Sequence, residues 1–179
     1  MSIQEIPLGP IHIRFLVDGT ADPAAAGTIS MFESTVAPGA RVPISHSHDA
    51  YEETLYALEG NLTLTLWDAA GNPQRMETRP GDHVLIPRGV VHRFDNFSSA
   101  PTRTLAVITP GVLGAAFFRE VGELVAAAMA TAATAPGGKP SPPDPAAIGK
   151  IMLRHGLTRA PSSRLPRTNF SPRTPVPHR

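Results

Sequence analysis

The feature that most constrains the fold is a regular succession of short strand-forming runs between Ile11 and Thr109. Each run is rich in β-branched or aromatic residues, and Gly, Pro, Asn or Asp separates it from the next about every 8 to 12 residues. Such spacing is typical of antiparallel sandwiches and barrels, in which tight turns join short strands. We therefore expect an all-β fold with strands at residues 11–17, 28–36, 42–48, 53–58, 62–67, 74–78, 83–86, 91–96 and 102–108.

The run 62–67 alternates apolar and mostly polar residues, and its apolar face consists of Leu62, Leu64 and Leu66. This period of two is the pattern of a half-buried strand. Gly60 and Asn61 precede the run and can adopt the positive φ angles of a tight turn, so we expect a hairpin with strand 53–58. A second turn is expected at residues 70–73.

The period of the apolar residues changes after Pro110. Apolar side chains then fall on one face of a helix, at Leu113, Phe117, Val121, Leu124 and Ala128. We expect a helix over residues 111–133 that packs on the barrel. A shorter helix is expected over residues 144–156, because Asp144 can cap it, Pro145 suits its first position and Gly156 suits its end.

Charge and proline are distributed unevenly along the chain. Residues 1–133 carry 8 Lys+Arg and 14 Asp+Glu, whereas residues 134–179 carry 8 and 1, together with ten of the 20 prolines. We therefore expect a β-barrel domain at 1–110, a linker at 134–143 and a basic, Pro-rich, disordered tail at 157–179. Arginines spread through a Pro- and Ser-rich segment favour a solvated tail, so no nucleic-acid partner is expected.

Two absences restrict the chemistry and the location. The chain has no cysteine, which excludes disulfides and thiolate ligands, so a metal site would need His, carboxylate or water ligands. The N-terminal sequence MSIQEIPLGP lacks a basic segment followed by an apolar core, and Arg119, Glu120 and Glu123 interrupt the apolar stretch 112–133. We expect a cytoplasmic protein without a membrane span.

Histidine and carboxylate residues supply the candidate chemistry. His46 and His48 lie two apart on an expected strand, so their imidazoles point to the same face. Two imidazoles and a carboxylate can hold a divalent ion with open coordination positions, and a third imidazole strengthens the site. Glu53 and His92 are the candidates for these further ligands. Taken alone, however, an adjacent histidine pair is equally consistent with an exposed strand face.

Two motifs surround these residues. The first, G-x6-H-x-H-x4-E-x6-G, consists of Gly39, His46, His48, Glu53 and Gly60. The second, G-x5-P-x-G-x2-H-x3-N, begins 20 residues after the end of the first and consists of Gly81, Pro87, Gly89, His92 and Asn96. Together they resemble the paired motifs of the cupin superfamily, and the chain resembles a small single-domain cupin.

The resemblance implies a double-stranded β-helix, which is a small jelly-roll barrel, here with a C-terminal α-helical extension. It also implies one divalent transition metal, which could be Fe, Mn, Ni, Cu or Zn, held by His46, His48, Glu53 and His92. The six residues between Gly39 and His46 depart from the family's usual five and indicate a loop one residue longer. Strand parity and the six-residue gap to the next glycine favour Glu53 over its neighbour Glu52.

Among cupins, the chain is most similar to small cupins of the quercetin-dioxygenase type. This similarity implies a dioxygenase-type oxidoreductase that acts on a small organic molecule, with Glu53 also able to move protons if it detaches from the metal. Two alternatives stay open. One is a non-oxidative isomerase, lyase or hydrolase that uses the ion as a Lewis acid, and the other is a non-catalytic small-molecule-binding cupin. The resemblance further suggests a homodimer.

The remaining histidines are expected at the surface or in ordinary hydrogen bonds. They are His12 and His83, and also His155 and His178, which are expected to face solvent.

Overall fold

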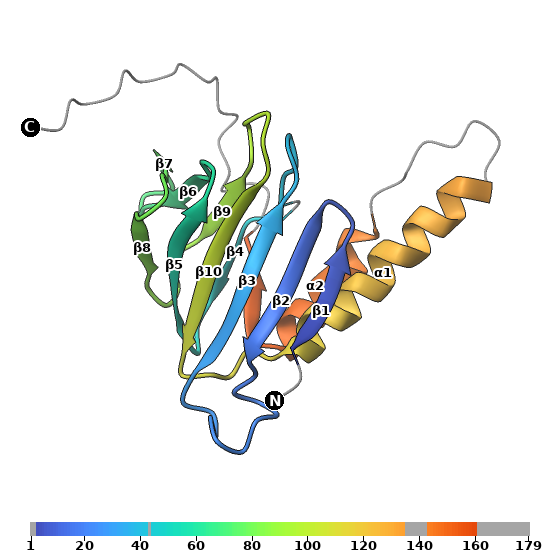
Figure 1. Cartoon of the computed structure of the whole chain (residues 1–179), viewed down its shortest axis with the longest axis horizontal. Coiled ribbons are helices and arrows are strands. Elements are labelled where there is room, and N and C mark those ends of the chain that lie inside the picture. The colour runs from blue at the N-terminus through green and yellow to red at the C-terminus, as the bar shows by residue number, and fades with distance from the viewer. Residues whose placement is uncertain (1–2, 43, 135–142, 161–179) are drawn as a thin grey trace, which may run out of the picture.

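Two antiparallel β-sheets face each other in the computed structural model, which describes residues 3–42, 44–134 and 143–160 (Figure 1). The six-stranded sheet has the order β1 (Gln4–Leu8), β2 (Ile11–Val17), β3 (Ser30–Val36), β10 (Thr102–Thr109), β5 (Glu52–Glu59) and β8 (His83–Ile86). The five-stranded sheet has the order β11 (Leu157–Arg159), β4 (His46–His48), β9 (His92–Asp95), β6 (Thr63–Trp67) and β7 (Pro73–Glu77). The all-β prediction is confirmed.

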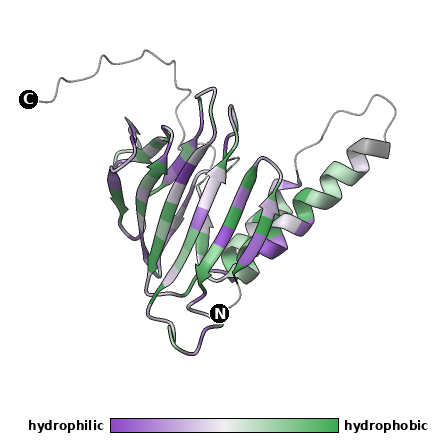
Figure 2. Cartoon of the chain, in the orientation of Figure 1, coloured by the Kyte–Doolittle hydropathy of each residue, from purple (hydrophilic) through white to green (hydrophobic). Residues whose placement is uncertain are grey.

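The core lies between the sheets because alternate residues of each strand point inward. In β3 and β10, Phe32, Val36, Ala106 and Ile108 are buried, whereas the residues next to them in each strand remain more exposed. Leu64 of β6 is buried from the opposite sheet. Figure 2 shows the alternation of hydrophobic and hydrophilic residues along these strands. Packing of the two inner faces fixes the direction of every side chain that points into the barrel.

The predicted hairpin between strands 53–58 and 62–67 is wrong. Strand β5 belongs to the six-stranded sheet and β6 to the five-stranded sheet, so the turn at Gly60 carries the chain from one sheet to the other. Gly60 has a φ of 68°, and a Cβ there would lie 2.7 Å from the carbonyl oxygen of Pro101, so a side chain does not fit. Alternating leucines identify the buried face of a strand but not its pairing partner. The second predicted turn is present in the β6–β7 hairpin, where Gly71 has a φ of 85°.

The helix expected after Pro110 is present as α1 (Ala115–Thr134). It packs against β1, and the Phe118 ring lies 5.6 Å from the Phe15 ring and 4.9 Å from the Phe32 ring, measured between centroids. Because Phe15 and Phe32 are buried on the inner face of the six-stranded sheet, α1 covers that face near β1 and β2 (Figure 1).

The second expected helix is present as α2 (Pro145–Arg154). The Asp144 side chain accepts a hydrogen bond of 2.9 Å from the backbone N–H of Ala146, and Gly156 follows the helix with a φ of 76°. These are the start and stop signals that the sequence indicates. Within the described ranges, neither helix combines the length and the apolarity needed to cross a membrane.

The sequence patterns do not predict two of the strands, β1 and β11. Strand β11 follows α2 and pairs antiparallel with β4. The expectation of disorder from residue 157 onward is therefore wrong for residues 157–159. The rest of the expected tail, residues 161–179, and most of the expected linker, residues 135–142, lie outside the described residues.

Candidate metal centre

The four residues predicted as ligands converge inside the barrel. His46 and His48 lie on β4, and His92 lies opposite His46 on the adjacent strand β9. Glu53 reaches them from β5 of the facing sheet. The ring centroids are 4.5 Å apart for His46 and His92, 4.8 Å for His48 and His92, and 6.0 Å for His46 and His48. Among the described residues, the three histidines form a group that could hold a metal ion, with ligand atoms within 4.8 Å of one another.

Each imidazole is oriented by a backbone carbonyl group. The distance from Nδ1 to the carbonyl oxygen is 3.2 Å for His46 and Ile44, 3.0 Å for His92 and Val90, and 3.3 Å for His48 and Tyr51. Because a carbonyl oxygen can only accept, each Nδ1 carries the hydrogen and each Nε2 presents a lone pair. Nε2 is therefore the atom available to a metal ion, while the Nδ1–H is held by an outer partner, as is usual for histidine ligands.

Glu53 adds a carboxylate to these lone pairs. Its Oε2 lies 3.1 Å from Nε2 of His48 and 3.5 Å from Nε2 of His92. Because each Nδ1 carries the hydrogen, both contacts bring an acceptor nitrogen, Nε2, against an acceptor oxygen, Oε2. Two acceptors repel each other, so a proton or a cation between them is needed for stability. Nε2 of His92 is buried and has no hydrogen-bond partner among the described residues. This set of donor atoms fits a divalent metal ion, which neutral imidazoles and a carboxylate bind well.

Burial also sets the protonation states of the cluster. His92 is 0% exposed and Glu53 is 7% exposed. Burial and the neighbouring His92 lower the pKa of His46 from 6.5 to about 3, so this ring is neutral at pH 7. Burial acts to raise the pKa of Glu53, but the adjacent imidazoles of His48 and His92 outweigh it and hold the pKa well below its usual range. A neutral imidazole and an ionised carboxylate are the forms that metal binding requires.

Tyr51 is a residue of the site that the sequence patterns do not identify. Its ring stacks on the His48 ring at a centroid distance of 4.2 Å, and its side chain is fully buried. Burial and the nearby Glu53 carboxylate raise the pKa of the Tyr51 hydroxyl, which therefore stays protonated. Within the part of the chain that the structure describes, the hydroxyl has no hydrogen-bond partner. The one available signal in the sequence is its place between His48 and Glu53.

Neighbouring motif positions take structural roles. Glu52 turns away from the cluster and pairs with Arg88 at 2.8 Å, as strand parity predicts. The side-chain amide of Asn96, the last residue of the second motif, donates hydrogen bonds to the main-chain oxygens of Val36, Ala37 and Ala100. Asn96 therefore joins the loop after β3 to the loop after β9, and its role is structural.

The other described histidines lie outside the cluster. His83 on β8 and His12 on β2 are exposed, in line with the expectation for them. His155, expected to face solvent, is instead half-buried, with Nε2 2.8 Å from a carboxylate oxygen of Glu120. His178 lies outside the described residues.

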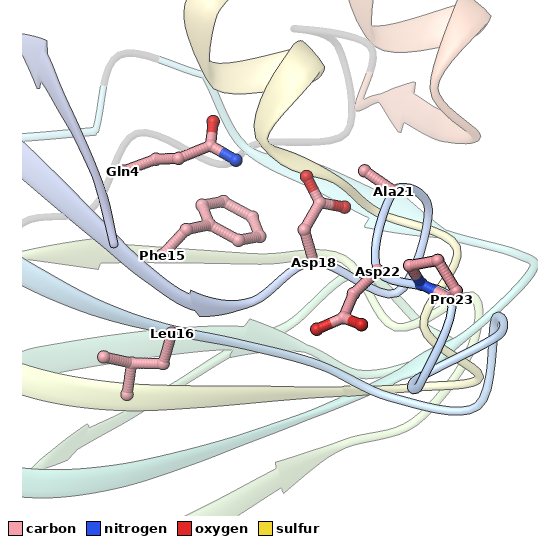
Figure 3. Close-up of a pocket in the computed structure, with 7 residues that line it drawn as sticks. All are labelled: Gln4, Phe15, Leu16, Asp18, Ala21, Asp22 and Pro23. Atoms are coloured by element: carbon pink, nitrogen blue, oxygen red, sulfur yellow. The ribbon is translucent and has the colours of Figure 1, made fainter. Parts of the chain in front are cut away.

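A surface hollow elsewhere also contains carboxylates. It lies where β1 and β2 meet the loop after β2 (Figure 3), and its lining residues are Gln4, Phe15, Leu16, Asp18, Ala21, Asp22 and Pro23. The Asp18 carboxylate already accepts hydrogen bonds from Thr20 and, at 3.0 Å, from the backbone N–H of Ala115. Ala115 is the first residue of α1, so Asp18 caps this helix from a distant loop. We assign the hollow a structural role.

Asp18→Ala is expected to lower the free energy of unfolding by about 1 to 3 kcal/mol, because buried N–H and O–H donors lose their acceptor. Chemical denaturation followed by circular dichroism measures this change. The metal content of the purified variant should equal that of the wild type, since Asp18 lies outside the histidine cluster. Loss of metal from this variant would place the ion in the hollow instead.

The comparisons with known proteins agree with the fold and the motifs. Residues 32–108, which contain all four candidate ligands, match the family described as "Cupin domain". The chain is 32% identical over 80 residues to quercetin 2,3-dioxygenase of Bacillus subtilis (strain 168), a match that covers 45% of this chain and 22% of the relative. It is 30% identical over 81 residues to an uncharacterized protein of Methanocaldococcus jannaschii, covering 45% of this chain and 60% of the relative. Among solved structures, the formate complex of Lactobacillus farciminis oxalate decarboxylase superposes with a TM-score of 0.55 at 21% identity, covering 63% of this chain and 32% of that chain.

Fold and site together define a jelly-roll barrel with histidines and a carboxylate converging in its interior. Residues 32–108 match the cupin domain, which confirms the resemblance seen in the sequence motifs. Each match spans less than two thirds of the length of the relative or neighbour.

Proposed function

We propose that the protein is a metal-dependent cupin enzyme of the dioxygenase type that acts on a small organic molecule. One observation carries the proposal: histidine Nε2 lone pairs and a Glu53 carboxylate oxygen converge in a buried place where a cation is needed between them. The residues that would hold the metal are His46, His48, Glu53 and His92. The similarity to quercetin 2,3-dioxygenase over 80 residues supports the choice of dioxygenase chemistry.

The protein supplies a preformed set of ligands. They come from β4, β9 and β5, so the hydrogen bonding of two sheets fixes their positions. A divalent transition metal with four protein ligands would supply open coordination positions for substrate and O2. Fe, Mn, Ni, Cu and Zn all accept three imidazoles and a carboxylate, and elemental analysis of the purified protein distinguishes them.

Glu53 has a second proposed role, as a proton acceptor. Its contacts with His48 and His92 are made through Oε2. The lowered pKa keeps the carboxylate ionised at neutral pH but makes it a weak base while it contacts the histidines, so Glu53 would take up a proton from a bound substrate only after it detaches from the metal. The Tyr51 hydroxyl stays protonated under the influence of this carboxylate and would be available as a hydrogen-bond donor beside the site.

The walls beside the ligands favour a compact and largely apolar substrate. Ile108 of β10 and Ile86 of β8 pair in register with Glu53 on either side of it, and both are fully buried. A molecule that approaches the cluster therefore meets apolar side chains, with polar atoms at the ligands themselves. Phenols and diketones, which combine an apolar body with metal-binding oxygens, have this character.

Oxygen uptake by the metal-loaded protein tests the proposed reaction. With a suitable phenol or diketone, we expect O2 consumption that requires both the substrate and the metal and that is lost in Glu53→Ala. Turnover of the substrate without O2 would instead support the non-oxidative isomerase, lyase or hydrolase alternative. Binding of the substrate without turnover would support a non-catalytic small-molecule-binding cupin.

A homodimer is also proposed. The outer face of β5 and β8 exposes two large apolar side chains, Tyr56 at 43% and Leu85 at 57%. Light scattering coupled to size-exclusion chromatography is expected to give a mass of twice the 19.0 kDa of one chain. Leu85→Glu should shift the protein toward monomer without loss of bound metal, because a charge on this face disfavours association. A wild-type mass of one chain would contradict this proposal.

A further inference from the structure

Strand β4 carries two candidate ligands, yet most of its pairing comes from the C-terminal strand β11. Strand β4 has three residues, and its register with β9 consists of one pair, His46 with His92. Strand β11 pairs with all three residues of β4, placing Leu157 opposite His48, Thr158 opposite Ser47 and Arg159 opposite His46. Strand β11 is therefore the neighbour that pairs with β4 along its whole length.

One observed hydrogen bond shows which residues of β11 and β4 are hydrogen-bonded to each other. The backbone N–H of Ala160 donates to the carbonyl oxygen of Ser45 at 2.9 Å. In an antiparallel pair, hydrogen-bonded positions recur at every second residue, so Thr158 and Ser47 form the next bonded pair. The N–H of Arg159 then points away from β4. Because Ser47 lies between the two ligands, the pair at Thr158 fixes the backbone on which both imidazoles stand.

Strand β11 is itself fixed to the core. Leu157 is 3% exposed and belongs to the same buried cluster as Ile148 and Met152 of α2. Helix α2 is joined to α1 by Glu120, which pairs with both Arg154 and His155. The packing of α2 therefore determines where β11 lies along β4.

We propose that α2 and β11 are a positioning element of the metal centre, acting through the main-chain pair of Thr158 and Ser47. The inference rests on the proposed metal function and goes beyond it, because the segment that matches the cupin domain ends at residue 108. With β11 in place, the Nε2 atoms of His46 and His48 are held at a fixed spacing before the metal binds. Without it, β4 must be ordered during binding, and the entropy lost in ordering weakens the affinity.

A proline at position 158 of the full-length protein tests the inference, because proline lacks the N–H that pairs with Ser47. Thr158→Pro is expected to weaken metal affinity by about 10- to 100-fold, the range seen when outer partners of metal ligands are removed. Titration calorimetry of the metal-free protein with Co2+ gives the affinity. The visible absorption spectrum of bound Co2+ should also change, since it reports the ligand geometry, which a strand that only stabilises the fold would leave unaltered.

Two matched variants separate the hydrogen bond from other effects. Thr158→Ala keeps the N–H but removes the hydroxyl, which lies 3.5 Å from Asp49 Oδ2. Arg159→Pro introduces the same ring where the N–H points away from β4. Both are expected to bind Co2+ as the wild type does, with the same spectrum. If Thr158→Pro does not fold, amide hydrogen exchange of the wild type tests the inference instead. Coupling between two sites is reciprocal, so Co2+ binding must increase the protection of the Ser47 and Thr158 amides from exchange.

The outcomes distinguish this inference from the proposed function. Wild-type affinity and spectrum in a folded Thr158→Pro would overturn the positioning role and leave the metal centre intact. Unchanged exchange at Ser47 and Thr158 on Co2+ binding would do the same. Failure of the wild type to bind Co2+ would overturn the metal centre and the positioning role together.

Discussion

His48→Ala and His92→Ala are each expected to lower the metal content of the purified protein well below one ion per chain, whereas the wild type should retain about one ion per chain. Each variant removes one of the Nε2 atoms that lie within 4.8 Å of one another. A divalent ion left with two imidazoles and a carboxylate in a buried site loses both a strong ligand and the geometry that the strands impose. Elemental analysis of the purified proteins measures the effect, and circular dichroism verifies that each variant retains the β fold.

His83→Ala is the matched control for this experiment. His83 lies on β8 and is exposed, so its removal should leave the metal content at the wild-type value. Metal retained at full stoichiometry in folded His48→Ala and His92→Ala would contradict the assignment of the centre. The identity of the ion adds a second result: Fe, Mn, Ni or Cu would support dioxygenase chemistry, while stoichiometric Zn would favour a non-oxidative reaction or a structural site.

The four candidate ligands could be predicted because their motifs resemble those of the cupin superfamily, and strand parity agrees with that resemblance. His46 and His48 share a face in any strand, and parity turns Glu52 and Glu53 to opposite faces. The six-residue gap to Gly60 then favours Glu53 as the ligand. The second motif places His92 in a strand, and its turn residues fix where that strand begins. Local rules of this kind do not depend on which strands pair, so they held even where the predicted pairing failed.

Contacts between distant segments could not be predicted in the same way. The alternation of Leu62, Leu64 and Leu66 is compatible with either sheet, which is why the hairpin with β5 was expected and the crossover was found. Strand β11 is three residues long, and its partner β4 precedes it by more than a hundred residues. The Nδ1 partners of the histidines are main-chain carbonyl groups, which carry no signature in the sequence.

The metal-free protein is expected to become less stable as the pH falls from 7 to 5. His46 has a pKa of about 3 when folded and 6.5 when unfolded, so over this range the unfolded chain binds a proton that the folded chain does not. Stability therefore rises with pH, and the difference at this one residue amounts to about 2 kcal/mol between pH 5 and pH 7. Glu53 adds to the loss at lower pH, because a carboxyl with a lowered pKa contributes stability above its unfolded value of 4.5 and loses it below.

Chemical denaturation in the presence of a chelator, at pH 5 and at pH 7, measures this dependence. His46→Gln cannot take up the proton, so the difference between the two pH values should shrink by about 2 kcal/mol. His12→Gln changes an exposed histidine on β2 and should leave the wild-type difference unchanged. An identical pH dependence in His46→Gln and the wild type would contradict the prediction. The loss of stability in acid would then arise from groups other than His46, whose ring burial and His92 keep neutral.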